Sequence, residues 1–80
     1  MHETHLIEPI IKGISEHAKK EGGKKVIKVK LKIGQLLGVK EDTFSETFKV
    51  LSKNTILEGA ELELTSFPGT RLEVLSFDVE

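Results

Sequence analysis

The chain contains no cysteine, tryptophan or tyrosine, and its 4 aromatic residues are all phenylalanine. Because no thiol is present, disulfides, thiolate zinc sites and cysteine nucleophiles are excluded. The sequence also lacks any run approaching the ~18 apolar residues of a membrane span, and it lacks a basic N-terminal segment followed by an apolar one. We therefore expect a cytoplasmic protein that does not enter a membrane.

An excess of charge of one sign is missing as well. The chain has 12 Lys and Arg residues and 13 Asp and Glu residues, which gives a formal net charge of −1. A nucleic-acid-binding protein needs a basic field and usually aromatic stacking surfaces, so this class is not favoured. The glycines form no phosphate-binding loop, and no serine stands in a nucleophile-elbow pattern. We expect a protein that is not an enzyme.

The length of 80 residues predicts a single domain over residues 1–80, because so little apolar surface cannot form two cores. So thin a core also leaves homodimerisation open. From Leu6 to Glu21 apolar residues recur at helical spacing, with polar residues opposite. Pro9 suits only the first turn, so this helix either begins near Leu6 or has a distorted first turn.

Strict alternation over residues 24–34 predicts a half-buried strand, with the lysines on one face and the apolar residues on the other. The residues expected to face the core are Ile27, Val29, Leu31 and Ile33. A second helix is predicted from Asp42 to Lys53, capped by Asp42 or Thr43 and closed by Asn54.

A second strand is predicted over residues 58–65 and a third over residues 71–79. Between them, Pro68 and Gly69 suit the central positions of a type II turn, so we expect a hairpin. The apolar alternation changes phase along the third strand, which indicates a β-bulge near Val74. The sequence therefore predicts an α+β fold of order α-β-α-β-β, a three-stranded sheet with two helices packed on one face.

Some polar residues have a simple structural interpretation. Lysines of the first strand are expected to pair across strands with glutamates, rather than to bind phosphate. These residues are Lys28, Lys30, Lys32, Glu61, Glu63 and Glu73. His17 has no second histidine at i+3 or i+4, so it is expected to be partly buried with one polar partner.

The N-terminal segment MHETH offers unusual chemistry. In most proteins such a terminus is a loose tail. Here, however, an α-amine of ordinary pKa about 7.7 is partly neutral near pH 7. The amine and the His2 amide nitrogen can form one chelate ring with a metal, and that amide and the His2 imidazole can form a second. Nickel(II) and copper(II) prefer such square-planar nitrogen donors, whereas zinc prefers a tetrahedral site. The candidate ligands are therefore Met1 and His2, with the Glu3 amide or the His5 imidazole as the fourth donor.

Several segments together resemble a known family. They are MHE at the N-terminus, GQLLGV after the first strand, TFSETFKVLSKNTILEGAELEL, and RLEVLSFDVE. In this order they are similar to the hydrogenase and urease nickel-maturation chaperones, the HypA family. The resemblance implies a nickel-binding domain of the same element order. It places nickel on His2, with the Met1 amine and the amides of His2 and Glu3 completing the square, and gives the Glu3 side chain a supporting or partner-contacting position.

One departure from the family pattern is large. The family usually carries a zinc domain with two CxxC pairs inserted between the last two strands, whereas this chain has the short turn SFPGT over residues 66–70. We therefore expect no zinc, and the sequence fits both a natural minimal relative and an engineered deletion.

Two functions remain open at this point. The first is a nickel metallochaperone for [NiFe]-hydrogenase maturation, for which the resemblance implies a maturation GTPase and the hydrogenase large-subunit precursor as partners. The second is a metal-free truncated paralogue that serves as an interaction module for that GTPase, through the first helix and a free sheet edge.

Overall fold

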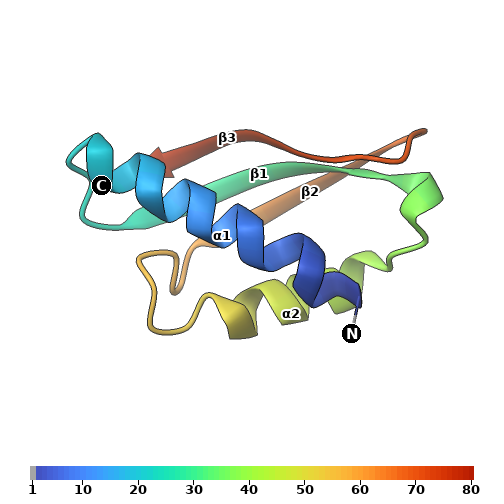
Figure 1. Ribbon diagram of the computed structural model, residues 1–80, viewed down its shortest axis with the longest axis horizontal. Helices are drawn as coiled ribbons and strands as arrows, with labels where there is room; N and C mark the ends of the chain where they lie inside the picture. The colour runs from blue at the N-terminus through green and yellow to red at the C-terminus, as the bar shows by residue number, and fades with distance from the viewer. Residues whose placement is uncertain (1) are drawn as a thin grey trace.

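The computed structural model describes the backbone of residues 2–80 and the side chains of residues 4–80. The elements, in chain order, are α1 (His2–Lys20), β1 (Val26–Gly34), the 3₁₀-helix η1 (Gln35–Leu37), α2 (Glu41–Leu51), β2 (Glu61–Phe67) and β3 (Leu72–Val79). Both α-helices lie on one face of the three-stranded sheet (Figure 1). The predicted α+β fold and its element order are confirmed.

The sheet has the strand order β2-β1-β3, with β2 parallel and β3 antiparallel to the central strand. The expected hairpin between the last two strands is therefore wrong. β1 contains the most deeply buried side chains of the sheet, and Val29 and Leu31 are 0% exposed. Its central position gives its backbone groups hydrogen-bonding partners on both sides, whereas an edge position would leave one row unpaired.

The segment between β2 and β3 crosses the end of β1 instead of making a tight turn. The Gly34 N–H donates to the Arg71 carbonyl at 2.7 Å, and the Leu36 N–H donates to the Gly69 carbonyl at 2.9 Å. Gly69 is not among the glycines with positive φ, so the predicted type II turn is not formed. A glycine is needed at position 34, because a Cβ there would overlap the Gly69 carbonyl group.

A bulge at Ile27 changes the face to which β1 side chains point. Val26 pairs with Val79 and Lys28 with Asp78, so Ile27 is an extra residue without its own partner. As a result Val26 is buried, while Ile27 is 47% exposed. The prediction that Ile27 faces the core is wrong, and the predictions for the rest of the strand are confirmed.

A second bulge lies in β3. Lys30 pairs with Ser76 and Leu31 pairs with Val74, which leaves Leu75 unpaired between them. The predicted bulge near Val74 is confirmed within one residue. Because the extra residue interrupts the ladder, Leu75 is 52% exposed at the free edge of the sheet.

The core lies between the two helices and the sheet. Its buried members come from α1, β1, α2 and the segment before β2, and they form one cluster. They are Ile7, Ile11, Ile14, Ala18, Val26, Val29, Leu31, Ile33, Phe44, Phe48 and Leu57. The described residues thus share a single core.

The helix boundaries differ from the prediction. α1 begins at His2 rather than near Leu6, with Pro9 inside the helix and on its exposed side. α2 begins at Glu41, and its N-cap, Lys40, makes no side-chain capping bond. No helix within residues 2–80 is long and apolar enough to cross a membrane.

The prediction that Asn54 closes α2 is wrong. Its C-cap is Ser52, whereas Asn54, expected to close the helix, follows in a left-handed turn with φ of 66°. The acidic residues of the first turn, Glu41 and Asp42, favour the helix start through the dipole instead of through a cap.

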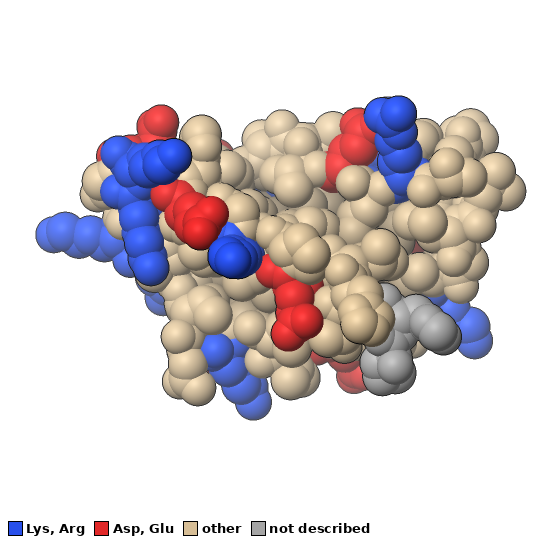
Figure 2. All heavy atoms as spheres, in the orientation of Figure 1, with Lys and Arg blue, Asp and Glu red and all other residues tan. Residues whose placement is uncertain are grey.

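The outer face of the sheet carries the predicted cross-strand pairs. The Lys28 ammonium lies 3.3 Å from a Glu63 carboxylate oxygen and 4.0 Å from one of Glu61. Lys32 is opposite Glu73 in the register, but its ammonium lies 4.3 Å from the centroid of the Phe67 ring, so the expected pairing is confirmed for Lys28 only. On the helix-covered side, basic and acidic residues are interspersed and form no patch of one sign (Figure 2).

Candidate metal centre

The backbone at the start of α1 has amide groups without helical acceptors. The first four N–H groups of an α-helix have no carbonyl acceptor within the helix. Because α1 begins at His2, the amides of His2 and Glu3 belong to this group. A metal ion can therefore replace their protons without breaking a hydrogen bond of the helix.

His5 is placed close to these donors by the helix itself. Residues at i and i+3 lie on the same side of a helix, and three residues rise only about 4.5 Å along the axis. His5 is exposed, so its imidazole is accessible from solvent. The structure therefore places this side chain within one turn of the His2 and Glu3 amides.

The electrostatics of a helix N-terminus select the kind of cation. The positive end of the helix dipole, about half an elementary charge, disfavours a bare cation. Two ionised amides would supply two negative charges and reverse this repulsion. A site that uses these amides would favour metals that displace amide protons and accept square-planar nitrogen donors, nickel(II) and copper(II) among them.

Part of the predicted ligand set is not described. Met1 lies outside the described residues, and so do the side chains of His2 and Glu3. The α-amine and the His2 imidazole therefore remain predictions, while the helical backbone at His2 and the exposed His5 are observed.

Elsewhere, among the side chains of residues 4–80, no group of three or more His, Cys, Asp or Glu is placed to hold a metal. His17 lies at the other end of α1, 3.7 Å from Glu21, and its ring is perpendicular to that of Phe77 at a centroid distance of 5.6 Å. Its side chain is 63% exposed, so the expected partial burial is wrong. The reason is that this end of the helix lies above the edge strand, where Phe77 covers one side of the ring only.

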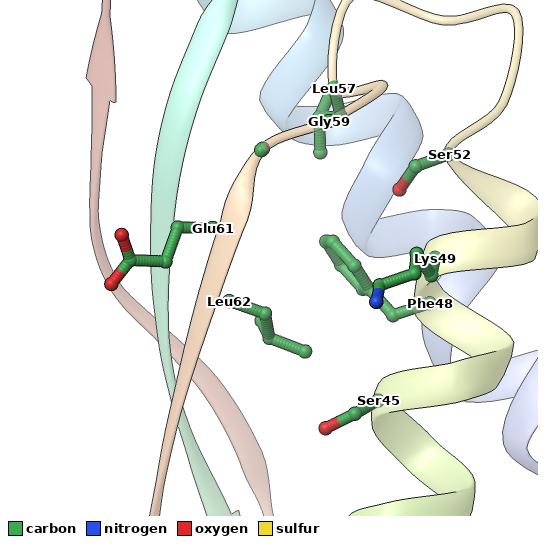
Figure 3. A pocket seen from close by; sticks show the side chains of 9 residues that line it. Ser45, Phe48, Lys49, Ser52, Leu57, Gly59, Glu61 and Leu62 are labelled. Carbon is green, nitrogen blue, oxygen red and sulfur yellow. The ribbon is translucent and has the colours of Figure 1, made fainter.

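Two surface features were not predicted from the sequence. An apolar groove lies between α1 and β3, where Pro9, Ile10, Val74 and Phe77 are among its lining residues. A more polar pocket lies between α2 and the start of β2 (Figure 3). The groove joins segments far apart in sequence, whereas the pocket is lined by residues 45–62 alone. The local signal of the pocket is the polar residues Ser45, Lys49 and Ser52 at helical spacing.

Comparison with known proteins gives consistent similarities in sequence. Residues 1–72 match the family model described as "Hydrogenase/urease nickel incorporation, metallochaperone, hypA". The chain is 36% identical over 69 residues to the hydrogenase maturation factor HypA of Beijerinckia indica, covering 86% of this chain and 61% of that protein. It is 39% identical over 69 residues to the corresponding factor of Nostoc punctiforme, covering 86% and 58%. The chain thus spans about 60% of the length of these curated relatives.

Comparison with solved structures supports the fold. The solution structure of the Ni metallochaperone HypA from Helicobacter pylori has a TM-score of 0.83 at 16% identity, covering 96% of each chain. A second solution structure, of a HypA protein, has a TM-score of 0.84 at 18% identity, covering 100% of this chain and 97% of that one. The match of the family model over residues 1–72 and the similarity to the curated relatives show that the chain belongs to the HypA family of nickel-incorporation metallochaperones.

Proposed function

We propose that this chain carries one nickel(II) ion for hydrogenase maturation and holds it at the start of α1. The ligands are the Met1 amine, the amide and imidazole nitrogens of His2, and either the Glu3 amide or the His5 imidazole. The observation that carries the proposal is the start of α1 at His2, because it leaves both amides without helical acceptors. Membership of the HypA family supports nickel over copper as the cargo.

A site on a chain terminus suits a carrier, because a delivered ion has to leave again. The donors come from the first residues of one segment, so an acceptor protein can replace them one at a time. We propose that the hydrogenase large-subunit precursor is this acceptor and that a maturation GTPase assists the transfer. The family description as a hydrogenase and urease nickel-incorporation metallochaperone supports a hydrogenase acceptor, and the GTPase follows from the family resemblance alone.

We also propose that the domain needs no zinc. The chain has no thiolate ligand, and its buried residues form one continuous cluster. Treatment with EDTA is therefore expected to leave the thermal unfolding midpoint unchanged, by circular dichroism. A fall of several degrees would contradict this, since removing a structural zinc ion removes folding free energy.

The ligand assignment can be tested by titration of nickel(II) followed by calorimetry and by the visible absorption of a low-spin square-planar complex. We expect His2→Ala to weaken binding at least tenfold, or about 1.4 kcal/mol, and to abolish the absorption band. His17→Ala, at the other end of α1, is the matched control and should bind as the unmodified chain does. Equal nickel binding by the unmodified chain, His2→Ala and His17→Ala would refute the terminal site.

His5→Ala distinguishes the two arrangements of the fourth ligand. If His5 binds, this variant weakens the affinity and shifts the absorption band to lower energy, because an imidazole has been replaced by a weaker donor. If the Glu3 amide binds, the variant retains both affinity and band.

A metal-free interaction module is the second candidate function. The observation in its favour is the apolar groove of about 370 Å³ between α1 and β3, beside a free sheet edge. This function predicts that GTPase binding survives His2→Ala and does not depend on nickel. Loss of GTPase binding in His2→Ala at saturating nickel would count against it.

A further inference from the structure

A pocket between α2 and the start of β2 is unrelated to the metal centre. It has a volume of about 400 Å³, within the range of roughly 300–1,000 Å³ typical of small-ligand sites. Figure 3 shows Phe48 entering it from α2 and Leu62 from β2, with Leu57 and Gly59 above them. The inner part of this pocket is therefore apolar.

A buried hydroxyl in this pocket has no partner. Ser52, at the end of α2, is 2% exposed, and its Oγ makes no hydrogen bond. Its hydroxyl points from the helix into the space above Phe48 (Figure 3). Because a buried polar group normally has a hydrogen-bonding partner, the unpartnered Oγ is available to bond a polar ligand atom.

The charges around the pocket favour an anion. Lys49 lies on the same side of α2 as Ser45 and Ser52, and Figure 3 shows its ammonium and the Ser45 hydroxyl on the pocket side. Glu61 also lines the pocket, but its carboxylate points away, beyond β2. That carboxylate lies 4.0 Å from the Lys28 ammonium on the outer face of the sheet. Lys49 is therefore the charged group directed at a ligand.

We propose that this pocket binds a carboxylate that carries a short branched aliphatic group. The carboxylate would accept hydrogen bonds from the Ser52 hydroxyl and the Lys49 ammonium, which gives charge-assisted contacts. The aliphatic group would lie on Phe48, Leu57 and Leu62, where it displaces water from an apolar surface. Such a ligand is either a free small acid or the C-terminal leucine of a peptide.

The test uses three probes followed by amide chemical shifts of the ¹⁵N-labelled full chain. They are 4-methylpentanoate, its neutral amide 4-methylpentanamide, and the peptide acetyl-Gly-Gly-Leu with a free carboxylate. We expect 4-methylpentanoate to give saturable shifts at residues 45–52 and 59–62, with binding at least fivefold tighter than that of the amide. Saturation by the peptide as well would assign the site to a chain terminus, and saturation by the small acid alone would assign it to a free ligand.

Two variants and one control complete the test. Lys49→Gln and Ser52→Ala are each expected to lower the affinity for 4-methylpentanoate about fivefold. Lys49→Gln should bind the neutral amide as tightly as the unmodified chain does. Lys53→Gln removes an exposed lysine outside the pocket and should have no effect. Dispersed amide spectra show that each variant is folded. The proposal is overturned if no probe gives saturable shifts, if acid and amide bind equally, or if Lys49→Gln binds the acid normally.

Discussion

At the scale of single residues, the space available for a side chain differs sharply between glycine positions. A Cβ at Gly34 would overlap backbone atoms of Gly69, whereas a Cβ at Gly13 would meet nothing within 4 Å. Both residues have ordinary negative φ, so the difference is one of space rather than of backbone strain. The two positions therefore form a matched pair.

Gly34→Ala is expected to destabilise the protein by about 1–3 kcal/mol, because the connection between β2 and β3 must move away from the end of β1. Gly13→Ala should stabilise it by about 0.5–1 kcal/mol, since alanine favours the interior of a helix. Urea unfolding measures both free energies. Equal effects of the two substitutions would contradict the close approach at Gly34.

Ser52 offers a second prediction at this scale. Its buried hydroxyl is unpartnered, and leaving such a group without a hydrogen bond costs about 1–3 kcal/mol. Ser52→Ala should therefore raise the free energy of unfolding by about 1 kcal/mol in the absence of a ligand. Ser45→Ala, at a half-buried position on the same helix, is the control. A loss of stability in Ser52→Ala would show that the hydroxyl has a partner after all.

At the scale of elements, the weak point of α1 is Pro9. A proline has no amide hydrogen, so the carbonyl of His5 loses its helical donor. The turns that carry the candidate metal ligands are therefore joined to the rest of the helix by one hydrogen bond fewer. Ile7 is 0% exposed and precedes Pro9, so the missing hydrogen bond lies where the helix already packs on the core.

Pro9→Ala should stabilise the protein by up to about 3 kcal/mol, the difference between the two residues in a helix interior. Hydrogen exchange of the amides in residues 9–12 should slow at the same time. Thermal unfolding checks the gain in stability, and the exchange rates check the slower exchange of these amides. An unchanged or lower stability would mean that the proline is better accommodated by the helix than its chemistry suggests.

At the scale of the whole molecule, the sequence predicted the elements better than their pairing. Periodicity located both helices and all strands, because each buries one face against the same core. The hairpin was wrong because neighbouring segments with a Pro-Gly turn favour local pairing, while the greater burial of β1 decided that it lies between the other two strands.

The candidate sites also were easier to predict from local sequence than from how the elements pack. The proposed metal centre rests on local order in MHETH, since its candidate donors follow one another along the chain. Its helical geometry could not be inferred, because Pro9 argued for a later start of α1. The pocket of Ser52 lies within residues 45–62, but its shape depends on how β2 packs beside α2, which the polar spacing on α2 does not specify.

The central claim, that the N-terminal amine is part of the nickel site, is tested most directly by extending the chain. Nickel(II) is titrated into the untagged protein and into the same chain with Gly-Ser added before Met1, with heat, proton release and visible absorption recorded. We expect the untagged chain to bind one ion with release of amide protons and a square-planar absorption band, and the extended chain to lose this binding. Identical titrations of the two chains would contradict the claim.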